Sequence, residues 1–257
     1  MPENLIDLLK VAVSAAQLGG MEIMEIYESD DFGVEAKADE SPLTLADKAA
    51  HEAIVAELEK TGLPILSEEG ANIPFEERKN WQRFWMVDPL DGTKEFIKRN
   101  GEFTVNIALI ENGVPIIGAL FVPVTETMYL GGKGIGAYKQ VAGGKALKMP
   151  TSTLPLSPIK VVGSRSHMNE ETAQFVSNFK DHEMIAMGSS LKFMVVADGA
   201  AHFYPRFAPT MEWDTAAAQA IVEASGKRVV VAKNGKETPT PVSYNKKNLL
   251  NPHFLVK

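Results

Sequence analysis

Two aspartates, Asp88 and Asp91, flank a Pro-Leu pair at the point where a short apolar run ends. Carboxylates on a rigid turn, beside backbone carbonyls, are ligands that Mg²⁺ prefers in proteins. Gly92 and Thr93 follow at once. Glycine lets a backbone approach a ligand closely, and free N–H groups at the start of a helix can hold phosphate oxygens. This turn therefore predicts a divalent-metal site joined to a phosphate-binding site.

Other acids have ordinary structural explanations when each is taken alone. Glu68 and Glu69 fit a solvated strand end, and Asp214 fits a helix N-cap worth about 1 kcal/mol. Asp47 fits the acid of a capping box with Thr44. However, each acid closes an apolar strand or opens a helix, so folding can bring them to one sheet edge. Two carboxylates about 4 Å apart repel by roughly 4 kcal/mol at an effective dielectric constant of 20, so such a cluster needs cations.

The elements that carry these residues follow from hydrophobic periodicity. In the first half we expect two helices. The first is one long helix with a weak point at Gly19-Gly20, and the second has Thr44 as its N-cap and Gly62 just past its end. We also expect buried strands that turn at Asn112-Gly113. The first helix and the strands are predicted at residues 4–27, 64–67, 84–87 and 103–138. Residues 150–158 are predicted to form a linker. Beyond it, strands alternate with helices, predicted at residues 160–163, 169–179, 184–187, 190–197, 202–206 and 214–225.

Composition excludes several classes of protein. The chain has 257 residues, no cysteine and a formal net charge of -7. It therefore offers no thiolate chemistry and no basic stripe for polymeric nucleic acid. No stretch approaches a membrane span and no export signal is visible, so we expect a cytoplasmic protein, with peripheral attachment to the inner membrane left open. The Gly132-x-Gly134-x-Gly136 run predicts a hairpin rather than a nucleotide loop.

Taken together, the acids match the signature of a known family. In order and spacing, Glu68-Glu69, the Asp-Pro-Leu-Asp-Gly-Thr of residues 88–93 and the Trp-Asp-Thr-Ala-Ala of residues 213–217 resemble the lithium-sensitive inositol monophosphatase superfamily. The resemblance covers almost the whole chain. It implies an α+β fold, the layered α/β/α/β/α sandwich of the inositol monophosphatase and fructose-1,6-bisphosphatase type.

Further segments look like one branch of that superfamily, the 3′(2′),5′-bisphosphate nucleotidases. They are residues 81–85, 88–110, 164–167, 188–193 and 204–207. Members of the branch remove the 3′-phosphate from adenosine 3′,5′-bisphosphate (PAP), and some act on its sulfated precursor (PAPS). The expected partner is thus a small molecule. The metal ligands cannot distinguish this activity from inositol monophosphatase or fructose-1,6-bisphosphatase activity. A catalytically silent nucleotide or phosphosugar sensor is the rival of another class.

The resemblance also implies roles for individual residues. Two or more Mg²⁺ ions would be bound by Glu68, Asp88, the carbonyl of Leu90, Asp91 and Asp214. Thr93 would orient the attacking water with Glu68 or Asp47. Substrate contacts would come from Asp91, Gly92, Thr93, Ser164, His167, Gly188, Lys192, Arg206 and Asp214. Taken singly, Lys192 also fits a solvated helix charge and Arg206 a partner for an acid.

Two points remain open at this stage. The family usually places a glycine soon after Trp-Asp-Thr-Ala-Ala, whereas Ala218 and Gln219 follow here, so helix packing there is undecided.

We expect a metal-binding half over residues 1–150 and a nucleotide-recognition half over residues 151–257, joined as one compact unit. Either a monomer or a dimer is compatible with the sequence.

Overall fold

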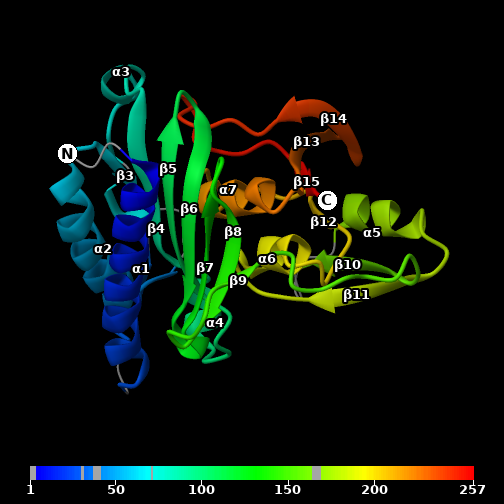
Figure 1. Ribbon diagram of the computed structural model, residues 1–257, viewed down its shortest axis with the longest axis horizontal. Helices are drawn as coiled ribbons and strands as arrows, with labels where there is room; N and C mark the ends of the chain where they lie inside the picture. Colours follow the sequence, from blue (N-terminus) through cyan, green and yellow to red (C-terminus); the bar gives the residue numbers. More distant parts are fainter. Residues whose placement is uncertain (1–3, 30–31, 37–41, 71, 164–168) are drawn as a thin grey trace.

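The computed structural model describes residues 4–29, 32–36, 42–70, 72–163 and 169–257. Five layers follow one another in Figure 1: a helix pair, a large sheet, a second helix layer, smaller sheets and a last helix. The helices are α1 (Leu5–Tyr27), α2 (Leu45–Leu58), α3 (Phe75–Arg78), α4 (Thr93–Ile97), α5 (Glu170–Ser177), α6 (Leu191–Ala197) and α7 (Ala216–Ala224). The predicted α/β/α/β/α sandwich is confirmed.

Seven strands form the large sheet, in the order β3-β4-β5-β6-β7-β8-β9. They are β3 (Ile65–Ser67), β4 (Arg83–Asp91), β5 (Thr104–Glu111), β6 (Val114–Val122), β7 (Thr127–Gly132), β8 (Gly136–Val141) and β9 (Leu147–Lys148). β3 and β4 run parallel, and the remaining neighbours are antiparallel. The glycine run at 132–136 is the β7–β8 hairpin, as predicted.

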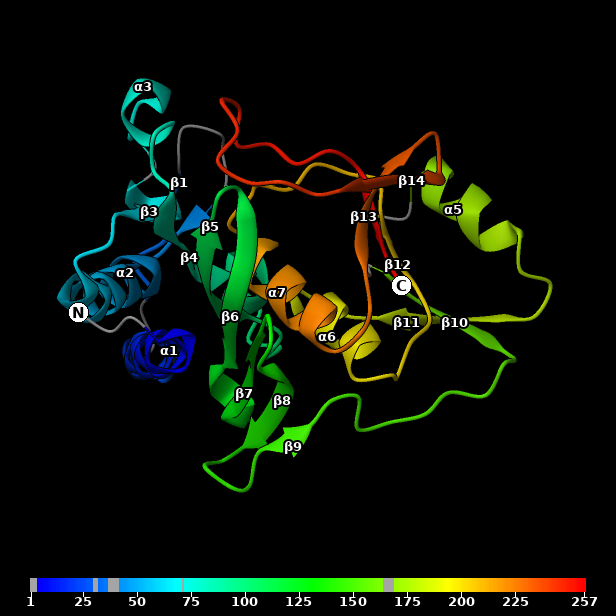
Figure 2. The ribbon, with the colours of Figure 1, turned by 45° about the horizontal axis from the view of Figure 1, so that its top comes forward.

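The smaller sheets lie on the other side of α6 and α7 (Figure 2). One has the order β12-β15-β13-β14 and another pairs β10 with β11 in parallel. Their strands are β10 (Ile159–Gly163), β11 (His182–Ala186), β12 (Tyr204–Arg206), β13 (Val229–Lys233), β14 (Lys236–Pro241) and β15 (Phe254–Val256). A short pair, β1 (Glu35–Ala36) and β2 (Pro42–Leu43), precedes α2. Periodicity did not predict the strands after α7.

Helix α1 continues through its glycine pair, as expected for the single helix predicted at residues 4–27. A Cβ atom at Gly19 would lie 2.7 Å from the Ile54 side chain, and one at Gly20 would lie 2.5 Å from Phe121. These glycines therefore let α1 pack against α2 and the sheet. One strand boundary differs from the prediction, because β4 does not end at Val87 but continues to Asp91 through an irregular register.

The large sheet separates two hydrophobic cores. Along β4, Trp85 and Val87 pack in the core beneath α1 and α2, whereas Phe84 and Met86 pack in the core on the α7 side. Because strand side chains alternate between faces, Asp88 continues the row on the α7 side. Its partner across the ladder is Asn106 on β5. Asp88 thus extends a row of buried apolar side chains.

Helix α7 crosses this face at very close range. A Cβ atom at Gly118 on β6 would lie only 2.2 Å from the carbonyl oxygen of Ala217. Glycine at this position therefore allows the start of α7 to touch the sheet. Through this contact the C-terminal part of the chain shares the core of the large sheet. The proposed division near residue 150 falls where residues 149–158 form neither helix nor strand, and the division itself stays a prediction.

Candidate functional site

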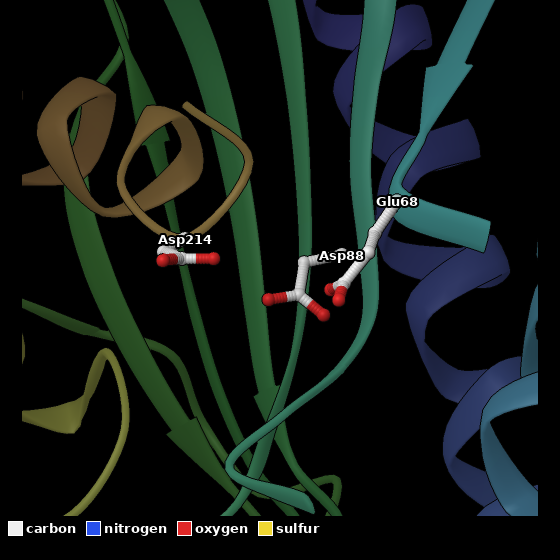
Figure 3. Close-up of side chains that lie close together, drawn as sticks. All are labelled: Glu68, Asp88 and Asp214. Carbon is white, nitrogen blue, oxygen red and sulfur yellow. The ribbon is translucent and has the colours of Figure 1, made fainter. Parts of the chain in front are cut away.

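Three acids from separate segments meet at one end of the large sheet. Glu68 follows β3, Asp88 lies on β4, and Asp214 lies two residues before α7. Each offers a carboxylate oxygen, and these oxygens all lie within 4.8 Å of one another (Figure 3). The parallel pairing of β3 with β4 places Glu68 and Asp88 at neighbouring positions. The convergence expected from the sequence is present.

The electrostatics of this cluster favour a bound cation. Burial raises the pKa of Asp88 well above its ordinary value, and Glu68, Asp91, Asp214 and Asp47 raise it further. Burial also raises the pKa of Asp214, with added repulsion from Asp91 and Glu68. Buried carboxylates surrounded by carboxylates are costly unless a cation neutralises them. Oxygen ligands of this kind suit a hard divalent cation, so the donor set fits Mg²⁺.

The alternative role of Asp214 as an N-cap is wrong. Thr215 occupies the N-cap position of α7 and makes no side-chain capping bond. Instead, one carboxylate oxygen of Asp214 accepts a hydrogen bond from the Met211 N–H at 2.9 Å. This bond fixes the carboxylate on the turn before the helix. The Asp214 carboxylate is thereby directed towards the acidic cluster and does not cap the helix.

Asp47 forms the predicted capping box and also contacts Thr93. Its Oδ2 atom accepts hydrogen bonds from the N–H and the hydroxyl of Thr44, at 2.7 and 2.6 Å, which completes the capping box. Its Oδ1 atom accepts from the hydroxyl of Thr93 at 3.3 Å. That hydroxyl also lies 3.3 Å from the carbonyl oxygen of Leu90. The capping box therefore orients Asp47 for contact with Thr93.

Gly92 shapes the turn between Asp91 and α4. Its φ of +95° is in the left-handed region, which glycine adopts without a steric penalty. A Cβ atom there would lie 3.2 Å from both the Glu102 carbonyl oxygen and the Ser189 Cβ atom. Both the conformation and the space thus require glycine, as the sequence suggested.

A pocket borders the acids on the side of α6 and β12. Among the residues predicted to contact substrate, those that line it are Asp91, Gly92, Gly188, Lys192, Arg206 and Asp214. Ser164 and His167 lie outside the described residues. The pocket thus brings together the turn that follows β4 and the cationic side chains of Lys192 and Arg206, which are distant from it in sequence.

Among the cationic side chains that line the pocket, Lys192 is buried and Arg206 is half-buried, whereas Lys94 is exposed. Lys192 is 7% exposed, and its Nζ donates a hydrogen bond to the Ser189 carbonyl at 2.6 Å. Burial lowers the pKa of Lys192 to about 8, although Asp91 favours the charged form. Arg206 donates to the carbonyl of Pro209, and its buried Nε has no partner among the described residues. An unused buried donor of this kind is available to an anionic ligand.

Sequence reasoning missed a polar network behind the pocket. The Ser190 hydroxyl lies 2.7 Å from the Thr104 hydroxyl and donates to Asn106 at 2.9 Å. The Ser190 N–H donates to a carboxylate oxygen of Asp91. The signal was present, because Thr104 and Asn106 are polar at alternate positions of an otherwise apolar strand. This network ties Asp91 to the start of α6.

Gln219 explains the departure from the family pattern after residue 217. Its Oε1 atom accepts a hydrogen bond from the hydroxyl of Tyr244 at 2.7 Å. That hydroxyl lies 3.1 Å from the Thr215 hydroxyl, next to Asp214. Gln219 is 1% exposed, so it supports the turn that carries Asp214 from within the core.

Comparison with known proteins agrees with this fold. The model of the inositol monophosphatase family matches residues 4–254, so the chain belongs to that family. The 3′(2′),5′-bisphosphate nucleotidase CysQ of Escherichia coli is 44% identical over 253 residues, which cover 97% of this chain and 99% of that protein. The crystal structure of CysQ from Bacteroides thetaiotaomicron has 45% identity and a TM-score of 0.89, covering 98% of this chain and 97% of that one.

A more distant structure shows the shared fold alone. The inositol monophosphatase from Anabaena (Nostoc) is 23% identical, with a TM-score of 0.72 and coverage of 99% of this chain and 91% of that one. In the described part of this chain, none of the helices has the length and apolar character needed to cross a membrane.

Proposed function

We propose that the chain is a Mg²⁺-dependent phosphatase that hydrolyses PAP to AMP and phosphate by removing the 3′-phosphate. The observation that carries this proposal is that the acidic cluster adjoins a pocket lined by Lys192 and Arg206. A carboxylate cluster alone suits any phosphate monoester. The cationic side chains of Lys192 and Arg206 suit a substrate with a second anionic group, as in a bisphosphate. The names of the CysQ relatives support the same substrate.

In this proposal, Glu68, Asp88, Asp91, Asp214 and the Leu90 carbonyl would hold two Mg²⁺ ions. When bound, the ions would supply positive charge to the attacking and leaving oxygens of an in-line displacement. The N–H groups of Asp91, Gly92 and Thr93 would hold the 3′-phosphate.

Thr93 and Asp47 would handle the proton of the attacking water. The Thr93 hydroxyl has one proton, which it can donate to Asp47 or to the Leu90 carbonyl, and its lone pairs can accept a hydrogen bond from the water. Asp47 is 2% exposed and its Oδ1 atom contacts Thr93. A water proton can therefore pass through the hydroxyl to this carboxylate as the water attacks phosphorus. Glu68 is the alternative base. In both routes, solvent protonates the 3′-oxygen of the leaving group.

A substrate comparison tests the proposal. We expect PAP to be hydrolysed with a kcat/KM more than about 100-fold above that for inositol 1-phosphate or fructose 1,6-bisphosphate, because a polar site discriminates strongly against ligands that leave its groups unpaired. Phosphate release can be followed with malachite green, with PAPS as a further substrate. Activity should disappear with EDTA and fall with millimolar Li⁺. A preference for either sugar phosphate would contradict the nucleotidase assignment, and the absence of phosphate release from every substrate would favour the silent sensor.

Lys192→Met is expected to weaken recognition of the second phosphate. This change removes the charge but keeps much of the side-chain volume. The KM for PAP should rise by roughly 10-fold or more, since hydrogen bonds to charged groups are worth about 1.5–3 kcal/mol. The matched substrate is adenosine 3′-monophosphate, which lacks the 5′-phosphate. Equal rises in KM for both substrates would remove Lys192 from 5′-phosphate recognition.

The same side chain predicts a pH dependence. Because the pKa of Lys192 is lowered to about 8, its positive charge is present below that pH and lost above it. The KM for PAP should therefore rise as the pH increases through 8, while the KM for adenosine 3′-monophosphate changes little. In Lys192→Met the pH-dependent rise should be absent. Steady-state kinetics between about pH 6.5 and 9.5, a range centred on the lowered pKa and below the ordinary lysine value, would reveal it.

A further inference from the structure

Glu102 lies between the two turns that border the pocket. A Cβ atom at Gly92 would lie 3.2 Å from the Glu102 carbonyl oxygen, and one at Gly188 would lie 2.9 Å from the same oxygen. One residue therefore contacts both the turn after Asp91 and the turn that leads into α6. The position of Glu102 in the chain is itself supported, because its N–H donates to the Asn100 side chain at 2.9 Å.

The side chain of Glu102 holds the second of these turns directly. Its Oε2 atom accepts a hydrogen bond from the Gly188 N–H at 2.6 Å. Hydrogen bonds between a carboxylate and a backbone N–H are among the stronger ones in proteins. The Gly188 N–H is consequently engaged within the protein, although Gly188 lines the pocket.

The turn held by Glu102 has a backbone that requires support. Ser189 has a φ of +41°, which residues other than glycine rarely adopt. Strained conformations persist only where the surrounding structure holds them. Here the support comes from Glu102 on one side and from the bond between the Ser190 N–H and Asp91 on the other. The Ser189 carbonyl, fixed in this way, accepts the hydrogen bond from Lys192 Nζ.

The Glu102 carboxylate lies behind this turn and is not among the residues that line the substrate pocket. It borders a second cavity on the far side of the turn, together with Met187 and Leu191. A carboxylate beside an anion-binding pocket would repel substrate if it acted directly. Its place behind Gly188 instead lets it hold the backbone that positions Lys192.

We propose that Glu102 is a positioning residue for substrate specificity, which holds the turn at Gly188-Ser189 so that Lys192 is oriented for the second phosphate. This inference rests on the proposed nucleotidase function. Removing the carboxylate should weaken recognition of a bisphosphate without impairing the chemical step, because Glu68, Asp88 and Asp214 lie on other segments of the chain.

Two variants separate the hydrogen bond from the charge. Glu102→Gln keeps an oxygen that can accept from the Gly188 N–H, whereas Glu102→Ala removes it. In Glu102→Ala we expect the KM for PAP to rise about 10-fold, the size of effect of one lost charge-assisted hydrogen bond, with kcat and the KM for adenosine 3′-monophosphate within about twofold of wild type. Glu102→Gln should resemble wild type. Glu76→Ala, which removes a carboxylate from exposed α3, is the matched control.

Hydrogen exchange gives a second measurement that needs no substrate. The amides of residues 187–190 should exchange at least about 10-fold faster in Glu102→Ala than in wild type or Glu102→Gln, since loss of the bond frees the turn to open. Unchanged exchange in a folded Glu102→Ala protein would contradict the positioning role. So would Glu102→Gln behaving like Glu102→Ala, or equal KM changes for both substrates. Failure of the wild-type protein to hydrolyse PAP would contradict the proposed function instead, while the exchange result still reports on Glu102.

Discussion

Replacing Asp88 by asparagine is expected to lower kcat by more than about 100-fold while the protein stays folded. Even residues that only support a metal ligand cost 10–100-fold when changed, and Asp88 is the acid repelled by all four of the other acids near it. Asparagine has nearly the same shape but carries no charge. Steady-state phosphate release at several Mg²⁺ concentrations would measure the effect, and wild-type rates would contradict the proposed metal site.

The same variant should be more stable than wild type when metal is removed. Because the pKa of Asp88 is raised in the folded state, ionisation of this group at neutral pH favours unfolding. Asparagine cannot ionise, so the metal-free variant should have the higher Tm near pH 7, with the difference shrinking as the pH falls. Mg²⁺ should raise the Tm of wild type more than that of the variant. Asp7→Asn, the same chemical change on the exposed face of α1, should alter neither quantity.

Gly118→Ala is expected to destabilise the fold and reduce activity together. The added methyl group would meet the Ala217 carbonyl at 2.2 Å, so α7 must move away from the sheet. Overpacking of this kind typically lowers the free energy of unfolding by about 1–3 kcal/mol and occasionally more. Because the contact with the backbone is so short, we expect a loss at the upper end of this range. For a chain of this size the Tm should fall by roughly 10 °C. Asp214 precedes α7 by two residues, so its distance from Asp88 should change as well.

Gly134→Ala is the control for this prediction. Gly134 lies in an exposed hairpin turn with a φ of +76° and no atom within 4 Å of an added Cβ. Alanine there incurs only the conformational penalty of the left-handed region, about 1 kcal/mol. Thermal unfolding of both variants, with Mg²⁺ titrations of activity, would separate the two causes. Equal losses of stability would show that α7 tolerates displacement from the sheet.

The convergence of the acids was predictable because each stands at an element boundary. Glu68 and Asp88 end apolar runs, and Asp214 precedes an alanine-rich helix, so the sequence places them where a sheet edge forms. The detailed geometry was less accessible. Asp214 looked like an N-cap because a helix follows it closely, whereas its bond to Met211 depends on a turn that leaves no periodic signal.

Contacts between distant segments account for most of what sequence reasoning missed. The bond between Glu102 and Gly188 joins residues 86 positions apart, and neither residue alone suggests the other. Strands β13 to β15 were also missed. β14 is largely exposed and contains two prolines, which weakens its strand pattern. Such edge strands are recognised mainly by the partners they find in the folded chain.

The charges of the site are distributed between layers, and this has an evolutionary consequence. The acids lie at the end of the large sheet and before α7, whereas Lys192 and Arg206 come from α6 and β12. Mutations confined to those two short elements can therefore alter which molecule fits while the carboxylate geometry stays intact. A gene duplicate could diverge towards a new substrate in small steps, retaining hydrolysis throughout.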